Sequence, residues 1–194
     1  MIIVYFVLLS IPVSLLCGGR FKYMLENPLH LIWLPLLAFS AEAAFPLLQK
    51  YVALPVAKWL WIAVVFEYAL LFLFCLLNWR RKSVRLIALA CLLNFFVIAW
   101  YGFRMPVAPI AREFPQMAAT VSRIESGELF EYVLVASGAP FLFLGDALLL
   151  PFLHSGLASI GDLLLAVGVS WLIFEWMRPV RKNRDTRAAY RRAT

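Results

Sequence analysis

The sequence predicts an all-α polytopic membrane helix bundle, and two observations support this prediction. The first is composition: 64% of the residues are hydrophobic and 15% are charged, whereas soluble domains carry roughly 45–50% apolar and about 25% charged residues. The second is the arrangement of the apolar residues along the sequence, because they form runs close in length to the roughly 20 residues that cross a bilayer. We therefore expect one transmembrane domain, residues 1–178, followed by a basic cytoplasmic tail, residues 179–194.

About five of these apolar runs are predicted to span the membrane as helices. They cover residues 1–16, 29–49, 59–78, 84–101 and 159–177. Gly18 and Gly19 end the first run. Trp59 and Trp79 flank the third run, as expected for aromatic side chains at the two membrane interfaces.

Two further elements are expected on the outer side, between the fourth and fifth spans. Apolar residues recur there at helical spacing, which predicts a short amphipathic helix on the membrane surface or capping the bundle. They are Ile110, Phe114, Met117, Val121 and Ile124. Residues 140–153 are apolar but too few to span, and Gly145, Asp146 and Pro151 interrupt them. That pattern favours a re-entrant hairpin.

The placement of Lys and Arg predicts the orientation. The net charge is +7, and the basic residues gather in the turn at residues 80–85 and in the tail. Cytoplasmic loops of membrane proteins carry such an excess, so we expect the C-terminus in the cytoplasm and the N-terminus outside. Membrane lipids, and not nucleic acid, are the partners that these basic segments predict.

Neither a metal site nor a cofactor is expected. Cys17, Cys75 and Cys91 lie in or at the ends of apolar runs without a CxxC pair, and His30 and His154 are far apart in the sequence. A zinc site needs several such ligands at close spacing. The sequence also lacks a P-loop and a dinucleotide-binding fingerprint.

Asp146 and Asp162 are the leading candidates for chemistry. Each follows a glycine in an otherwise apolar stretch, where a carboxylate is costly unless it is solvated, paired or used. If the two meet, one keeps a proton, and the pair can act as general acid and general base on water. The alternative is structural: Ser159 and Asp162 have the spacing of a capping box, and Asp146 would cap a helical turn at residues 147–150.

Glu42 and Glu67 form a second candidate pair, because each lies near the centre of a predicted span. Intramembrane carboxylates serve in proton relays or cation binding. The alternative is that each is protonated and hydrogen-bonded to a neighbouring helix.

Asn94 and Arg104 are candidates for positioning a substrate. Asn94 lies within the fourth span, where a polar side chain also joins neighbouring helices by hydrogen bonds. Arg104 follows that span, where it can hold an anionic group, pair with Asp146 or Asp162, or serve as an ordinary interfacial arginine.

The motifs that contain these residues resemble those of an uncharacterised bacterial multi-pass membrane family. They are Arg104-Met105-Pro106-Val107, Leu144-Gly145-Asp146, and Ser159-Ile160-Gly161-Asp162 with Gly168. The resemblance covers most of the chain. It implies a multi-pass fold in the bacterial inner (cytoplasmic) membrane and brings no known activity.

A second resemblance covers about 35 residues. Asp162, followed by Gly168 at the start of the last span, looks like part of the signature of lipoprotein signal peptidase. That family pairs this aspartate with an upstream aspartate near the outer face of the membrane, which implies Asp146 as the partner. Two other motifs of that family are absent, so the resemblance is limited to the two aspartates.

These observations leave two classes of function. The first is a membrane-embedded aspartyl hydrolase that acts on a lipid-linked or membrane peptide substrate, with Asp146 and Asp162 as its catalytic pair. The second is a non-catalytic subunit of a membrane complex, or a small proton-coupled carrier that uses Glu42 and Glu67. A hydrolase requires the two aspartates to lie close together, whereas a carrier requires the two glutamates to share a polar cavity.

Overall fold

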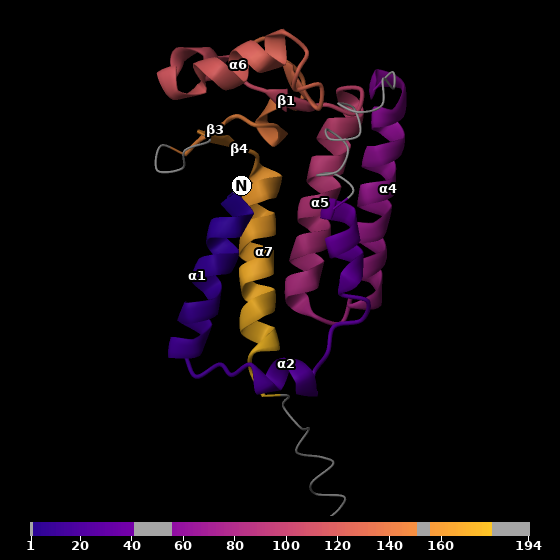
Figure 1. Ribbon diagram of the computed structural model, residues 1–194, viewed down its shortest axis with the longest axis vertical. Coiled ribbons are helices and arrows are strands. Elements are labelled where there is room, and N and C mark those ends of the chain that lie inside the picture. Colours follow the sequence, from indigo (N-terminus) through magenta and orange to yellow (C-terminus); the bar gives the residue numbers. More distant parts are fainter. Residues whose placement is uncertain (1, 41–55, 151–155, 180–194) are drawn as a thin grey trace, which may run out of the picture.

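The chain is mostly helical, and a cap of short elements covers one end of a helical bundle (Figure 1). The computed structural model describes residues 2–40, 56–150 and 156–179. The helices are α1 (Ile2–Leu16), α2 (Lys22–Glu26), α4 (Val56–Leu77), α5 (Lys82–Trp100), α6 (Ala118–Glu125) and α7 (Ile160–Trp176). The strands are β1 (Met105–Val107), β2 (Tyr132–Leu134), β3 (Leu148–Leu149) and β4 (Leu157–Ala158).

Two described helices are long and apolar enough to cross a membrane. They contain the segments Trp59–Leu77 of α4 and Lys82–Trp100 of α5, and the apolar segment Val4–Leu16 of α1 is shorter. The helices predicted at residues 59–78, 84–101 and 159–177 are therefore confirmed as helices. In the second predicted span residues 33–40 are helical and residues 29–32 are not, whereas residues 41–49, including Glu42, lie outside the described residues.

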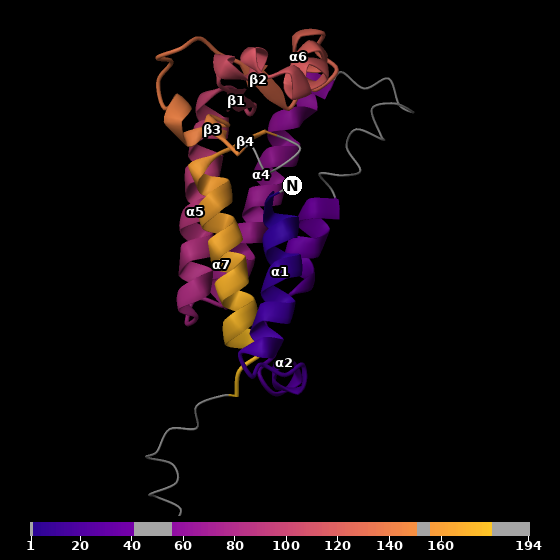
Figure 2. The ribbon, with the colours of Figure 1, turned by 90° about the vertical axis from the view of Figure 1, so that its left-hand side faces the viewer.

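Helix α7 is central, because it packs against both α1 and α5. It runs parallel to α1: the backbone N–H of Arg20, just after α1, donates to the carbonyl of Met177, just after α7, at 2.9 Å. It runs antiparallel to α5, because Gly161 and Gly168 of α7 face Asn94 and Ile87 of α5. Figure 2 shows the three helices side by side below the cap.

Two buried clusters hold the fold together. The larger joins α4, α5 and α7 with residues of the second predicted span, and includes Leu34, Ala38, Cys75, Val84 and Leu172. The smaller lies in the cap and consists of Val107, Ala111, Met117, Val121 and Ile124. The cap therefore has a core of its own above the bundle.

The predicted amphipathic helix is confirmed in its second half only. Val121 and Ile124 of α6 are buried, as their spacing predicts, but Ile110 is exposed. Pro109 and Pro115 each begin a short 3-10 helix, at Pro109–Glu113 and Pro115–Met117. A proline cannot donate a backbone hydrogen bond in the interior of a helix, so the register of a continuous helix is lost at Ile110.

The segment predicted as a re-entrant hairpin, residues 140–153, contains a short 3-10 helix at Leu142–Leu144 and one short strand, β3. Leu148 and Leu149 of β3 pair antiparallel with Ala158 and Leu157 of β4. Leu148 and Leu149 are extended, so the expected helical turn capped by Asp146 is wrong. The backbone N–H and C=O groups of β3 form hydrogen bonds with β4 instead of with a helical turn. The spacing of apolar residues along the chain does not reveal such a non-local contact.

The end of the bundle opposite the cap is polar and basic. It holds Arg20, Lys22, Arg178 and the turn between α4 and α5 (Figure 1). Hydrogen bonds join its elements: Trp176 Nε1 donates to the Met24 carbonyl at 3.1 Å, and Arg81 donates to the Asn27 carbonyl at 3.0 Å. The basic residues of the described ranges at positions 20–22, 80–85 and 178 thus lie at one end of the fold.

Candidate functional site

A hydrogen-bonded cluster joins α5 to the start of α7 directly below the cap. Asn94 is buried, and its Nδ2 donates to Asp162 Oδ1 at 3.1 Å. Ser159 Oγ donates to Asn94 Oδ1, also at 3.1 Å. The expectation that Asn94 joins neighbouring helices is confirmed by these two bonds.

The first turn of α7 fixes the position of Asp162. The Asp162 backbone N–H donates to Ser159 Oγ at 2.9 Å, and the Ser159 backbone N–H donates to Asp162 Oδ2 at 3.1 Å. The predicted capping box is therefore present. The other carboxylate oxygen, Asp162 Oδ1, takes no part in the capping box and accepts the hydrogen bond from Asn94.

Gly161 makes this cluster possible. A Cβ at this position would overlap the Asn94 carboxamide. Only glycine lets the α7 backbone approach Asn94 this closely, because it has no side chain to occupy the space. The motif Ser159-Ile160-Gly161-Asp162 thus combines a cap, a close approach and a carboxylate.

Asp146 is placed by the cap. Its backbone N–H donates to the Pro106 carbonyl at 2.9 Å, and its carbonyl accepts from the Ala108 N–H at 3.0 Å. These bonds make an isolated bridge between Val107 and Asp146. A Cβ on the preceding Gly145 would lie 2.5 Å from the Pro106 carbonyl oxygen, so this position also requires glycine. The motifs at residues 104–107 and 144–146 therefore meet in space.

The surroundings of Asp146 disfavour its charged form. Burial among protein atoms, reinforced by the negative charge of Asp162, raises the pKa of Asp146 to about 7. Although the residue keeps a partly exposed surface, no side-chain hydrogen bond to its carboxyl group occurs within the described ranges. Near neutral pH this group therefore exchanges a proton.

The two aspartates are within electrostatic range of each other but have different neighbours. Asp162 accepts hydrogen bonds from two N–H groups, whereas Asp146 is positioned by its backbone. No direct hydrogen bond between the two carboxyl groups is found among the described contacts. A water molecule or a substrate group would have to bridge them in a shared reaction.

Arg104 does not pair with either aspartate. It is partly buried immediately before β1, whereas other arginines of the cap form the ion pairs Arg112–Glu125 and Arg123–Glu128. The parallel pairing of Met105 with Tyr132 places Glu131 beside Arg104 in register. The Glu131 Oε2 atom is buried without a hydrogen-bond partner in the described part of the chain. Sequence reasoning missed Glu131, because it resembles the other charged residues of that polar segment.

The remaining candidates are separate from this cluster. Glu67 lies in α4, within electrostatic range of Cys91 in α5. Glu42 lies outside the described residues, so the pairing of Glu42 with Glu67 stays a prediction. Within residues 2–40, 56–150 and 156–179, no group of three or more His, Cys, Asp or Glu side chains is arranged to hold a metal ion.

Replacing Asn94 with leucine is expected to destabilise the protein. The change leaves the buried Ser159 hydroxyl without its acceptor and removes one donor from Asp162. Each buried polar group left unpaired costs about 1–3 kcal/mol, so the midpoint of thermal unfolding in detergent should fall. Asn94→Asp keeps an acceptor for Ser159 but adds a second negative charge beside Asp162. The unfolding midpoint of this variant should also be lower than that of the wild type. An unchanged midpoint in Asn94→Leu would show that the cluster adds nothing to stability.

The fold and the site together define a helical protein with two helices that are long and apolar enough to span a membrane, and with two aspartates near the cap that lie within electrostatic range of each other. The chain belongs to DUF5317, a family of unknown function, which matches residues 26–174. That range includes every candidate residue discussed above. No curated protein and no solved structure matches the chain.

Proposed function

We propose that this chain is an integral membrane protein of the bacterial inner membrane in which Asp146 and Asp162 hydrolyse a lipid-linked or membrane peptide substrate. The observation that carries the proposal is that Asp146 lies partly buried within electrostatic range of Asp162, two conditions that raise the pKa of Asp146 to about 7. Pairs of titratable groups with contrasting surroundings are typical of general acid and general base partners.

The apolar surface of the bundle supports the membrane location. Large apolar side chains are exposed along several helices, including Leu8 and Leu9 on α1, Phe66 and Leu76 on α4, and Leu92 on α5. Contiguous exposed patches of this kind are rare on soluble monomers and mark surfaces that contact lipid or another protein. With the basic end of the bundle in the cytoplasm, the cap and both aspartates lie on the outer side.

The proposed reaction divides the two roles by environment. Asp162, held by two N–H donors, accepts a proton from a water molecule whose oxygen attacks the carbonyl carbon of the substrate. Protonated Asp146 gives its proton to the leaving group as the scissile bond breaks. The proton gained by Asp162 then returns to Asp146, directly or through solvent, and restores the starting state. No cofactor is required.

The test replaces each aspartate singly with asparagine in cells whose only copy of the protein is the variant. General acid–base groups typically contribute about 10²–10⁴-fold to rate, so either variant should cause an uncleaved membrane peptide or lipid-linked precursor to accumulate. Mass spectrometry of the membrane lipids and lipoproteins measures this. Glu128→Gln is the matched control, because Glu128 is an acidic residue in an exposed ion pair of the cap. Unchanged profiles in both aspartate variants, with normal protein levels, would refute the hydrolase.

A non-catalytic membrane subunit is the second candidate, favoured by the bonds of Asp162. Both Asp162 carboxylate oxygens accept bonds that stabilise α7 or join it to α5. A structural role alone explains those bonds, although it does not explain the burial of Asp146. A carrier based on Glu42 and Glu67 has no comparable support, because the position of Glu42 is not described.

A further inference from the structure

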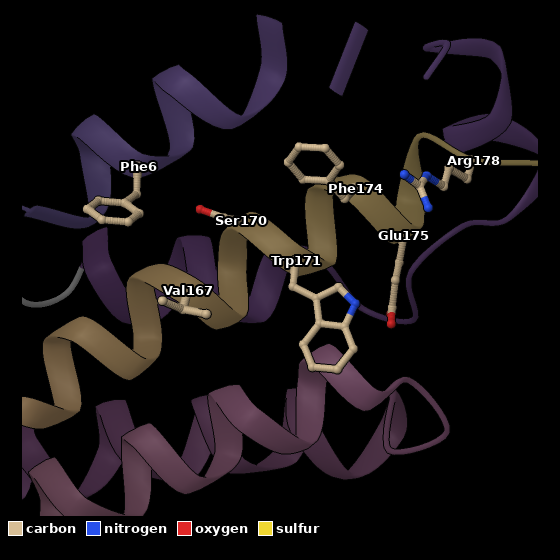
Figure 3. Close-up of a pocket in the computed structure, with 7 residues that line it drawn as sticks. All are labelled: Phe6, Val167, Ser170, Trp171, Phe174, Glu175 and Arg178. Carbon is tan, nitrogen blue, oxygen red and sulfur yellow. The ribbon is translucent and has the colours of Figure 1, made fainter. Parts of the chain in front are cut away.

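A groove follows the outward face of α7 in the half of the bundle away from the cap (Figure 3). It has a volume of about 440 Å³. It is lined by Phe6 of α1 and by Val167, Ser170, Trp171, Phe174, Glu175 and Arg178. These residues of α7 recur at spacings of three and four, so they form one continuous face.

The groove is apolar along most of its length and basic at its end. Val167 is 49% exposed and Trp171 is 41% exposed, and both offer apolar surface. Arg178 is exposed at the end of the groove, and the backbone bond between Arg20 and Met177 brings a second basic residue to the same end. The apolar part of the groove therefore suits the acyl chain of a phospholipid, and its basic end suits the phosphate group.

Glu175 does not oppose this polarity. Its Oε2 accepts a hydrogen bond from Ser83 Oγ at 2.7 Å, and its charge interacts with Arg81. In Figure 3 the Glu175 side chain extends away from the last turn of α7, and Arg178 lies just beyond the end of the helix. The Glu175 carboxylate is therefore engaged with Ser83 and Arg81 at the α4–α5 turn.

We propose that this groove binds one anionic phospholipid, with an acyl chain along α7 and the phosphate at Arg178. The proposal rests on the membrane location proposed above but not on catalysis by the aspartates. The dimensions agree: from Val167 to the end of the helix at Trp176, α7 rises roughly 14 Å at 1.5 Å per residue, and Arg178 follows two residues later. That is about half of the roughly 30 Å hydrocarbon core, the depth of one leaflet. Arginine binds phosphate through a fixed fork of N–H donors.

The test is tryptophan quenching in the purified full-length protein, with brominated phosphatidylglycerol compared with brominated phosphatidylcholine in mixed micelles. The contribution of Trp171 is obtained by subtracting the quenching of Trp171→Phe. We expect phosphatidylglycerol to quench Trp171 more strongly. Arg178→Gln should reduce the preference for phosphatidylglycerol about five-fold, because one basic residue strengthens binding to an anionic lipid surface by about that factor. Trp100→Phe is the matched control, because Trp100 is an exposed tryptophan at the cap end of α5.

A second variant separates the groove from general attraction to the basic tail. Val167→Phe fills the groove without changing the charge or adding a tryptophan and should remove the Trp171 preference, whereas tail attraction alone would leave the preference intact. Equal quenching of Trp171 by both lipids, or a preference that survives both variants, would overturn the proposal. Asp146→Asn should keep the lipid preference, so loss of the hydrolase does not affect this test. A protein that stays soluble without detergent would instead refute the membrane location.

Discussion

Replacing Gly168 with leucine is expected to abolish accumulation of the folded protein. A Cβ at this position would lie 2.8 Å from Ile87 Cγ1 and 3.2 Å from the Ile87 backbone nitrogen. The side chain of Ile87 can shift slightly, but the backbone of α5 cannot retreat without separating α5 from α7 along their whole interface. Overpacking a core typically costs about 1–3 kcal/mol, and a leucine side chain at a helix contact should exceed that range.

The measurement is the yield of monodisperse protein in detergent by size-exclusion chromatography, followed by thermal unfolding. Val167→Leu is the matched control, because Val167 is the preceding residue of α7 and is exposed. Gly168→Ala should give an intermediate result, since the nearest neighbour of a single methyl group is the Ile87 side chain, which can shift slightly. Wild-type yield and stability in Gly168→Leu would show that α5 and α7 do not pack as closely as described.

Much of the helical architecture could be predicted because bilayer-length apolar runs specify helices directly. The runs at residues 59–78 and 84–101 became α4 and α5, and Gly18 lies in the turn after α1, with φ 85°. The cap could not be predicted in the same way. Its strands contain two or three residues each and pair with partners distant in the sequence, as Met105 does with Tyr132. Periodicity records only local structure, so such pairings leave no signal.

The candidate site shows the same division. The capping box of Ser159 and Asp162 is local and was predictable from its spacing. The bond from Asn94 to Asp162 joins two helices, and only the general cost of a polar group within a span suggested it. The bridge between Val107 and Asp146 had no sequence signal beyond the presence of Gly145 and Pro106, whose close approach explains both motifs.

The stability of the protein is expected to fall as pH rises from about 4 to about 7, and Asp146→Asn should remove much of this dependence. An aspartate has a pKa near 3.8 when unfolded, and burial, with the charge of Asp162, raises the pKa of Asp146 to about 7 in the fold. Between these values the unfolded chain releases a proton that the folded protein retains, so ionisation favours unfolding. This loss of stability is complete above the pKa of Asp146 in the folded protein. It amounts to a few kcal/mol, because each unit of pKa difference between the folded and unfolded states corresponds to about 1.4 kcal/mol.

The measurement compares the thermal midpoints of wild type and Asp146→Asn in detergent at pH 5 and pH 8. The variant should be more stable than wild type at pH 8, and the difference should narrow toward pH 4, where both forms are neutral. Asp162→Asn tests the second cause separately, because it removes the neighbouring charge and leaves the burial of Asp146 unchanged. Asp162→Asn should therefore reduce the pH dependence of the thermal midpoint without removing it. If Asp146→Asn instead destabilised the protein at pH 8, the ionised carboxylate would be serving as a structural acceptor, and its role as a proton donor would be excluded.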